Sequence, residues 1–375
     1  MTSASYSSAA VEPFEGLRIR GVAKTFGTDT TVLNEIDLDV HPGELISLVG
    51  SSGTGKSTLL RIIAGLEEPS AGRVTYAGQP LERGSVGVVF QRPILYPHLS
   101  VKDNILFPTR LGAFAGRVDM DYYRELLEAL KLEGLESRKP SQLSGGQAQR
   151  VGIARALIRR APVVLFDEPL ASVDEEMSAS IRADIVRLHE RYGFTGLYVT
   201  HDQNEALMLG QRVAVMDAGY LVQVDTPERL LAHPHTLQVA KLMAAPALNL
   251  VALEDSAVLP AGCQLAIRAT ALCPVAADAA HSLPVQVLGS RHLVGGMLYR
   301  ARLLEAVSLP LESRRASADS EPSDRVYARV RAGQELEFFI PDAQSGSSLN
   351  VGDRVHLGVA AERCFVFSNG KRFYL

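Results

Sequence analysis

A glycine-rich run that follows a short apolar segment constrains the fold of this chain more than any other feature. The run Gly50–Thr58 reads GSSGTGKST and fits the pattern GxxxxGK[ST]. It follows the strand-like segment 45–49 and leads into a helix expected over 57–64. In this order of elements, the backbone N–H groups of the loop and the N-terminus of the helix all point at one anion. Glycine has no Cβ, so the backbone can approach that anion closely. The run therefore predicts a phosphate-binding loop within an α/β fold.

This loop and an acidic pair farther along the chain supply candidate residues for phosphoryl transfer from a nucleotide. Lys56 is expected to reach the β- and γ-phosphates, and the Ser57 hydroxyl to ligate Mg²⁺. Asp167-Glu168 follows the apolar run 163–166, where Asp167 would hold Mg²⁺ and Glu168 would orient and polarise the attacking water. The competing interpretations are a glycine turn that binds nothing and a solvated acidic loop. The flanking strand and helix argue against the first, and the presence of the phosphate-binding loop argues against the second. The remaining candidate ATP contacts are Gly50, Ser51, Ser52, Gly53, Thr54, Gly55 and Thr58.

The pattern of the chain changes near residue 240. Before that point, short apolar runs alternate with helical periodicity, which indicates an α/β domain around a mostly parallel sheet. After it, short strand patterns punctuated by proline predict an all-β module. We therefore expect a flexible tail over 1–16, an α/β domain over 17–245 and a β-rich domain over 246–375, with a loop insertion at about 308–324.

Composition excludes several classes of protein. With 46% hydrophobic and 21% charged residues, the chain has the balance of a soluble globular protein. Its three cysteines form no CxxC pair, which argues against a disulfide framework or zinc site and fits a reducing cytosol. We expect no membrane span and no secretory signal, since no run of about 20 apolar residues is present. The net charge of −4 shows no basic excess, so nucleic acid is not expected as a partner.

A second motif connects the chain with a known family. Residues 143–147 read LSGGQ just before a predicted helix, and on their own could be a simple helix N-cap. The segment is identical to the signature of ATP-binding cassette (ABC) ATPases, which the chain resembles over about 17–240. The resemblance implies a P-loop NTPase fold with a helical subdomain at about 92–160. It also implies a head-to-tail homodimer, in which the signature completes the partner's ATP site through Ser144, Gly145, Gly146 and Gln147.

Other positions match the same family one by one. Gln91 stands where the family has a glutamine that contacts Mg²⁺ or water and relays nucleotide state to the membrane partner. His201 matches the switch histidine that contacts the γ-phosphate, and Phe26 matches an aromatic that stacks on adenine. The competing interpretations are an unremarkable surface Gln, a structural His and a core Phe. Asp174 matches a residue of dimer communication, although the surrounding LASVD departs from the LSNLD that relatives often carry.

The resemblance is greatest to importers. Segments 91–107 and 223–234 resemble ATPases of the maltose and spermidine importer type, and the C-terminal module resembles their OB-like TOBE domain. Ala269-Thr270 departs from the Pro-Glu that often follows in that domain. The resemblance implies a peripheral protein on the cytoplasmic face of the inner membrane, with ATP and Mg²⁺ as cofactors. Its expected partners are a second copy, two transmembrane permease subunits and an extracytoplasmic substrate-binding protein.

The transported solute stays open at this point. A sugar or related polyol, including glycerol phosphates, is the expected class, with a polyamine, iron or an oxyanion as alternatives. A soluble regulatory or nucleic-acid-linked ABC ATPase is the alternative of another class. Such proteins usually carry two cassettes or long coiled-coil insertions, and the chain shows neither pattern.

Overall fold

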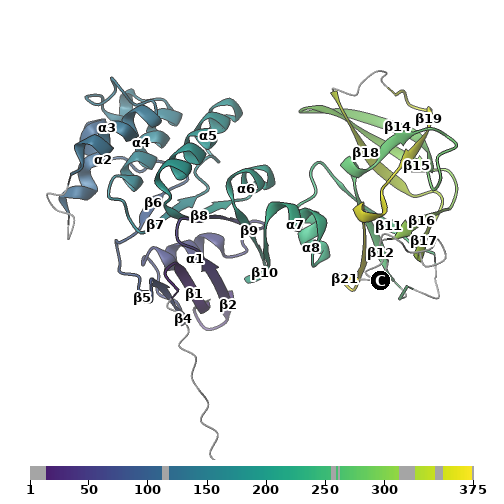
Figure 1. Cartoon of the computed structure of the whole chain (residues 1–375), viewed down its shortest axis with the longest axis horizontal. Helices are drawn as coiled ribbons and strands as arrows, with labels where there is room; N and C mark the ends of the chain where they lie inside the picture. The colour runs from purple at the N-terminus through teal and green to yellow at the C-terminus, as the bar shows by residue number, and fades with distance from the viewer. Residues whose placement is uncertain are drawn as a thin grey trace, which may run out of the picture. The chain divides into compact units, whose positions relative to one another are not determined.

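The computed structural model divides the chain into two compact units, Met1–Pro227 and Glu228–Leu375 (Figure 1). It describes residues 14–111, 118–254, 259–260, 262–311, 326–342 and 349–373. Most of the expected tail, residues 1–13, lies outside the described residues. The structure does not describe 312–325 of the expected loop insertion either, and the insertion's first residues lie in strand β16 (Val307–Leu311).

A six-stranded sheet forms the centre of the first unit, in the order β10-β9-β3-β8-β7-β6. Its strands are β3 (Leu45–Val49), β6 (Gly87–Val89), β7 (Val163–Asp167), β8 (Thr195–Thr200), β9 (Arg212–Asp217) and β10 (Tyr220–Asp225). All neighbours pair in parallel except β9 and β10. The expected mostly parallel sheet is therefore confirmed.

Two hydrophobic cores cover the two faces of this sheet. Successive residues of β7 alternate between them: Val163 and Leu165 belong to one core, Val164 and Phe166 to the other. This alternation follows from the period of two of a β-strand, and it explains why the strand is apolar throughout. On one side lie α1 (Lys56–Ile63) and an antiparallel sheet, and on the other lie the remaining large helices.

The antiparallel sheet has the order β2-β1-β4-β5, which the sequence pattern did not indicate. Its strands are β1 (Leu17–Phe26), β2 (Thr30–Val40), β4 (Ala71–Tyr76) and β5 (Gln79–Pro80). The buried residues Leu17 and Ile19 of β1 join the same core as Leu59 of α1. The helix that follows the glycine loop is thus held between two sheets.

Helices group together at one end of the first unit in Figure 1. They are α2 (Val101–Leu106), α3 (Met120–Ala129), α4 (Gly145–Leu157), α5 (Glu175–Tyr192) and α6 (Gln203–Leu209). The segment with α2 to α4 lies between β6 and β7, over the range expected for a helical subdomain. Arg150 of α4 donates from Nε to Asp184 of α5 at 3.1 Å, and the Asp184 side chain is fully buried. This buried charged pair fixes α4 to α5.

The second unit begins earlier than the boundary expected after residue 245. Helix α8 (Leu237–Leu242), which follows α7 (Pro227–Ala232), lies within this unit. The Leu237 N–H donates to the Gly370 carbonyl at 2.9 Å, and Ala240 packs against Phe365 and Phe367. The helical sequence pattern of α8 predicts that it belongs to the α/β domain. Its contacts with Gly370, Phe365 and Phe367 instead assign it to the β-rich unit.

Beyond α8 the unit is built of strands, so the prediction of an all-β second module is confirmed. Three sheets have the orders β11-β12-β20-β21, β13-β19-β14-β15-β18 and β16-β17. The new strands are β11 (Leu248–Ala252), β12 (Gln264–Arg268), β13 (Cys273–Val275), β14 (Leu283–Leu293), β15 (Gly296–Leu303), β17 (Val326–Val330), β18 (Glu335–Pro341), β19 (Arg354–Gly358), β20 (Cys364–Ser368) and β21 (Lys371–Phe373). Tyr299 and Phe338 stack at 5.1 Å inside one shared core.

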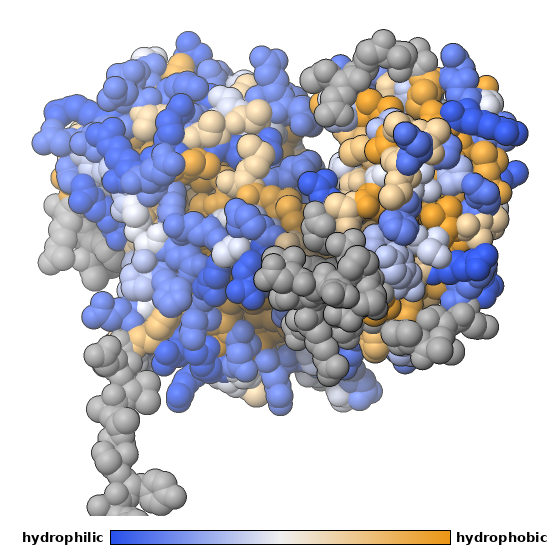
Figure 2. All heavy atoms as spheres, turned by 45° about the vertical axis from the view of Figure 1, so that its right-hand side comes forward, coloured by the Kyte–Doolittle hydropathy of each residue, from blue (hydrophilic) through white to orange (hydrophobic). Residues whose placement is uncertain are grey.

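No helix in the described ranges is long and apolar enough to cross a lipid bilayer. On the face shown in Figure 2, hydrophilic side chains lie over much of the surface, with apolar side chains between them.

Candidate nucleotide-binding site

The glycine loop lies between β3 and α1, as its sequence predicts. Gly53 and Gly55 adopt φ of 81° and 97°, which residues with a Cβ rarely adopt. A Cβ on Gly50 would lie 2.4 Å from the Met216 carbonyl oxygen, and one on Gly55 would lie 2.6 Å from Cδ2 of Leu33. These glycines are therefore needed for the close packing of the loop against its neighbours.

Lys56 lies inside the curve of this loop with only 5% of its surface exposed. Its ammonium group donates to the carbonyl oxygens of Gly50 and Ser51 at 2.8 and 2.9 Å. Burial lowers the pKa of Lys56, and the carboxylates of Glu168 and Asp167 oppose that shift. The Lys56 ammonium group thus lies where the backbone N–H groups of the loop can surround an anion.

Ser57 and Asp167, which are 110 residues apart in sequence, meet beside the loop. The Ser57 hydroxyl donates to Oδ1 of Asp167 at 3.2 Å. Burial raises the pKa of Asp167; the hydrogen bond from Ser57 opposes the shift and the Glu168 charge adds to it. A hydroxyl and a carboxylate are the oxygen ligands that Mg²⁺ uses together with substrate phosphates. The hydroxyl of Ser57 and the carboxylate of Asp167 fit Mg²⁺ in that shared form.

Glu168 and His201 are brought together by the order of the parallel strands. Glu168 follows β7 and His201 follows β8, and these strands pair directly. The Nδ1 atom of His201 lies 3.0 Å from Oε2 of Glu168. Glu168 has a φ of 45°, and its N–H donates to the Val199 carbonyl at 3.0 Å. A left-handed, non-glycine residue held in this way is typical of functional sites.

The LSGGQ segment caps the start of α4. The Ser144 hydroxyl accepts from the Gln147 N–H at 3.2 Å, and the Gln147 side chain accepts from the Ser144 N–H at 3.0 Å. This is a capping box, so the N-cap interpretation is correct within one chain. A Cβ on Gly146 would lie 2.5 Å from the sulfur of Met177. No hydrogen bond or ion pair among the described residues joins this segment to Lys56, Asp167, Glu168 or His201.

Comparison with known proteins agrees with this geometry. Residues 33–171 match the family model described as ABC transporter. The sn-glycerol-3-phosphate import ATP-binding protein UgpC of Salmonella typhi is 42% identical over 266 residues, which cover 68% of this chain and 74% of that protein. The chain belongs to the ABC transporter ATP-binding family. Its class of enzyme is accordingly that of an ABC-type ATPase, and its fold that of a P-loop NTPase, as predicted.

Further relatives are similar to part of this ABC protein. The UgpC 1 protein of Rhizobium johnstonii is 45% identical over 241 residues, so that the match spans 63% of this chain and 65% of that relative. The structure of cbiO1 from Clostridium perfringens has a TM-score of 0.53 at 27% identity and covers 59% of this chain and 92% of that one. The dimeric cassette MJ0796, bound to ADP and Pi, has a TM-score of 0.50 at 32% identity, and the match covers 56% of this chain and 98% of that one.

The remaining ABC motif residues lie at exposed positions around the first unit. Gln91 follows β6 and is exposed, and the neighbouring Phe90 carbonyl accepts from the buried Gln149 of α4 at 3.1 Å. Phe26 is 43% exposed at the end of β1, which disagrees with the interpretation as a core aromatic. Asp174 caps α5 by accepting from the Met177 N–H at 2.9 Å. The roles expected for these residues stay predictions.

Glu205 is a residue that the sequence analysis missed. It is 8% exposed on α6, and its Oε2 accepts from the hydroxyls of Thr200 at 2.7 Å and Tyr198 at 3.1 Å. The Thr200 hydroxyl also accepts from the Asp202 N–H at 3.0 Å. These bonds fix both neighbours of His201 in the chain. The spacing Asp202-x-x-Glu205, which resembles a capping box, is the sequence signal that could have identified it.

Glu205→Ala is expected to destabilise the protein by about 2 kcal/mol, because it leaves the hydroxyls of Tyr198 and Thr200 buried without an acceptor. ATP hydrolysis is expected to fall about tenfold as the turn that carries His201 loosens. Urea unfolding and steady-state hydrolysis of the full chain measure the two effects. Glu190→Ala, which removes an exposed carboxylate from α5, is the matched control. If both variants behaved alike, Glu205 would have no part in holding His201.

Proposed function

We propose that this chain is the subunit of an ABC importer that binds and hydrolyses ATP to energise solute uptake. The observation that supports the proposal most directly is the pairing of Ser57 with Asp167 and of Glu168 with His201, beside the loop that holds Lys56. The relatives named above are import ATP-binding proteins for sn-glycerol-3-phosphate. We accordingly propose glycerol 3-phosphate or a related polyol phosphate as the transported solute.

In this proposal each residue has one task in hydrolysis. Lys56 and the N–H groups of the loop bind the β- and γ-phosphates. Ser57 and Asp167 hold Mg²⁺, with Gln91 as a further ligand, and the bound ion neutralises phosphate charge. Glu168 orients and polarises the attacking water. His201 would donate from Nδ1 to the Glu168 carboxylate, which leaves the other ring nitrogen to face the γ-phosphate.

We propose further that two copies of the chain form the working unit. The cap Ser144–Gln147, in which Ser144 and Gly145 are exposed, offers a serine side chain and glycine N–H groups at the start of α4, a suitable cradle for the γ-phosphate bound by a second copy. The dimeric structure of a related cassette supports such a pairing. ATP would close the dimer by binding the closed form more tightly than the open one.

A docking surface for two permease subunits is proposed within residues 92–142. Ile94 and Leu111 are 63% and 53% exposed, and Tyr96 is 39% exposed. The first of these is held by Arg155, which donates to the Ile94 carbonyl at 2.6 Å. The buried side chain of Asn104 binds both backbone groups of Tyr96, at 2.8 and 3.1 Å. Exposed apolar side chains on a well-fixed backbone are typical of a protein contact. Docking there would hold the chain at the cytoplasmic face of the membrane.

The test is purification of the Glu168→Gln protein from its native membrane in mild detergent with ATP and Mg²⁺, followed by mass spectrometry. We expect two multi-span proteins to elute with it. Ile94→Asp in the same background serves as the matched control, since it should lose these partners and keep ATP binding. Recovery of soluble partners alone, from a preparation with intact membrane complexes, would contradict the importer assignment.

A further inference from the structure

A cavity of about 320 Å³ lies in the first unit, away from the nucleotide site. It is bordered by Gly43 before β3, Pro162 before β7 and Thr195 at the start of β8, so it lies at the amino ends of the parallel strands. The glycine loop, Glu168 and His201 all follow the carboxyl ends. At about 3.3 Å per residue, the five residues of β3 separate the two edges by roughly 16 Å. The cavity is therefore a separate site.

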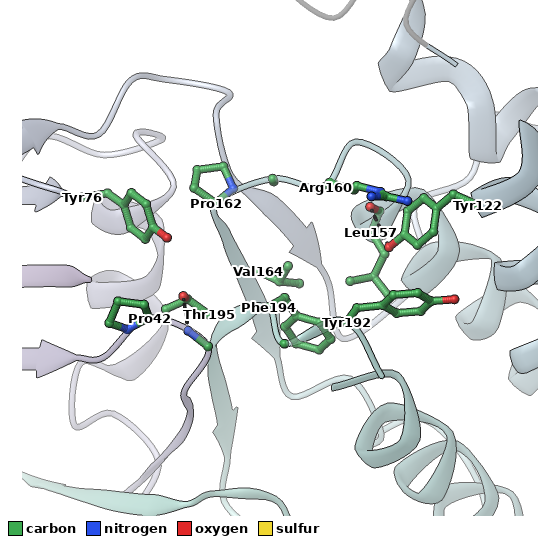
Figure 3. A pocket seen from close by; sticks show the side chains of 13 residues that line it. Pro42, Tyr76, Tyr122, Leu157, Arg160, Pro162, Val164, Tyr192, Phe194 and Thr195 are labelled. Atoms are coloured by element: carbon green, nitrogen blue, oxygen red, sulfur yellow. Dashed lines mark hydrogen bonds between the residues drawn. The ribbon is translucent and has the colours of Figure 1, made fainter. Parts of the chain in front are cut away.

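Aromatic and apolar side chains line the cavity, and polar atoms form about half of its exposed walls. Figure 3 shows Tyr76 and Pro42 on one side, and Tyr122 and Tyr192 on the other, with Val164 and Phe194 between them. Tyr122 and Tyr192 meet edge to face at 4.9 Å, which fixes both rings. The volume lies at the lower end of the range for small-molecule pockets, and walls of this kind suit a flat apolar body of one or two rings.

The polar side chains that line the cavity can each donate a hydrogen bond. The Thr195 hydroxyl is buried and accepts from the Gly43 N–H at 3.0 Å, and no acceptor among the described residues takes its own hydrogen. The hydroxyl of Tyr76 has no hydrogen bond to any residue that the structure describes. Asp and Glu are absent from the lining, which includes the cation Arg160. Donors together with one cation favour a ligand with an anionic acceptor.

Arg160 is held in an unusual way at the rim. It follows α4 with a φ of 48°, and its guanidinium lies 4.3 Å from the ring centroid of Tyr122. One guanidinium nitrogen of Arg160 forms an ion pair with the Asp119 carboxylate at 3.1 Å. The Arg160 side chain is 63% exposed and the Asp119 side chain 50% exposed. An exposed pair of this kind contributes little, and a guanidinium has five N–H donors. Arg160 can thus bind a second carboxylate, while stacking on Tyr122 sets its orientation.

From these observations we propose that the cavity binds a planar aromatic monocarboxylate. The ring system would pack among the tyrosines, and the carboxylate would accept hydrogen bonds from Arg160 at the Tyr122 side of the cavity. Such a ligand would contact Leu157 at the end of α4 and Val164 of β7. It would therefore bridge the helix that begins at Ser144 and the sheet that carries the glycine loop.

Naphthoate is the probe, and its neutral counterpart naphthamide is the matched ligand. The chain has no tryptophan, so fluorescence titration of either probe is free of indole emission. For the full chain we expect one saturable naphthoate site with a Kd in the micromolar range, and binding of naphthamide weaker by about tenfold or more. No saturable binding at millimolar probe, or equal affinity for both probes, would overturn the proposal.

Variants locate the site. Arg160→Asn keeps a residue that tolerates positive φ and removes the cation, so naphthoate binding should weaken by about tenfold or more while naphthamide binding stays constant. Tyr76→Phe keeps the ring and removes a hydroxyl on the side opposite Arg160, so it should leave naphthoate binding nearly unchanged. Arg124→Asn, at an exposed position of α3 outside the lining, should change neither. Unchanged naphthoate affinity in Arg160→Asn would place any binding elsewhere and refute the assignment.

Discussion

Glu168→Gln is expected to reduce ATP hydrolysis by at least about 100-fold and to leave ATP binding nearly unchanged. The amide has the shape of the carboxylate but cannot polarise water as a base. It can still contact Nδ1 of His201, which lies 3.0 Å from Oε2. Because the substitution spares the glycine loop and Lys56, the nucleotide should remain bound. The variant is therefore expected to accumulate as an ATP-bound dimer.

Single-turnover hydrolysis and size-exclusion chromatography with ATP and Mg²⁺ measure these two results. Glu175→Gln, which neutralises an exposed carboxylate in the first turn of α5, is the matched control and should hydrolyse ATP normally. Near-normal turnover by Glu168→Gln would remove Glu168 from its role. A monomer that holds ATP without turnover would instead keep that role and contradict the proposed dimer.

Lys56→Met is expected to weaken ATP binding by about 50-fold or more. The apolar stem of the side chain is kept, but the three donors of the ammonium group are lost, and charge-assisted hydrogen bonds contribute about 1.5–3 kcal/mol each. The carbonyls of Gly50 and Ser51 also lose their donor. Hydrolysis should disappear together with binding, unlike in Glu168→Gln.

Titration with a fluorescent ATP analogue measures this loss of affinity. Arg61→Met removes a cation from the exposed side of the same helix and should bind ATP within a few fold of the parent chain. Thermal unfolding without nucleotide separates a binding defect from a folding defect. If Lys56→Met bound ATP as tightly as Arg61→Met, the glycine loop would not be the phosphate site.

Much of the first unit could be predicted because its signals are local. The apolar run 45–49 is β3 residue for residue, and the helix expected over 57–64 is α1 shifted by one residue. Glycines at positive φ and a serine cap reveal themselves in the sequence through the residue types that such backbone positions require. The meeting of Ser57 with Asp167 could also be expected, since both follow strands that the pattern identified.

Other features depend on contacts that no local pattern records. The antiparallel pairing of β1 with β4 joins segments that are separated in the chain by β2, β3, the glycine loop and α1. Helix α8 has an ordinary helical pattern, and only its packing against Phe365 and Phe367 assigns it to the second unit. The spacing Asp202-x-x-Glu205 indicates a helix start, but only the structure shows that Tyr198 and Thr200 both donate to the Glu205 carboxylate.

The sequence by itself determined the chemistry of the site: a loop that only glycine permits, a lysine within it, and acidic and imidazole groups at strand ends. Only the tertiary structure decided which of these groups meet and what lies at the opposite edge of the sheet. The strand order β3-β8-β7 brings Glu168 to His201, and the same order gathers Gly43, Pro162 and Thr195 around the cavity. Strand order depends on hydrogen bonds between segments distant in sequence, where residue type carries little information.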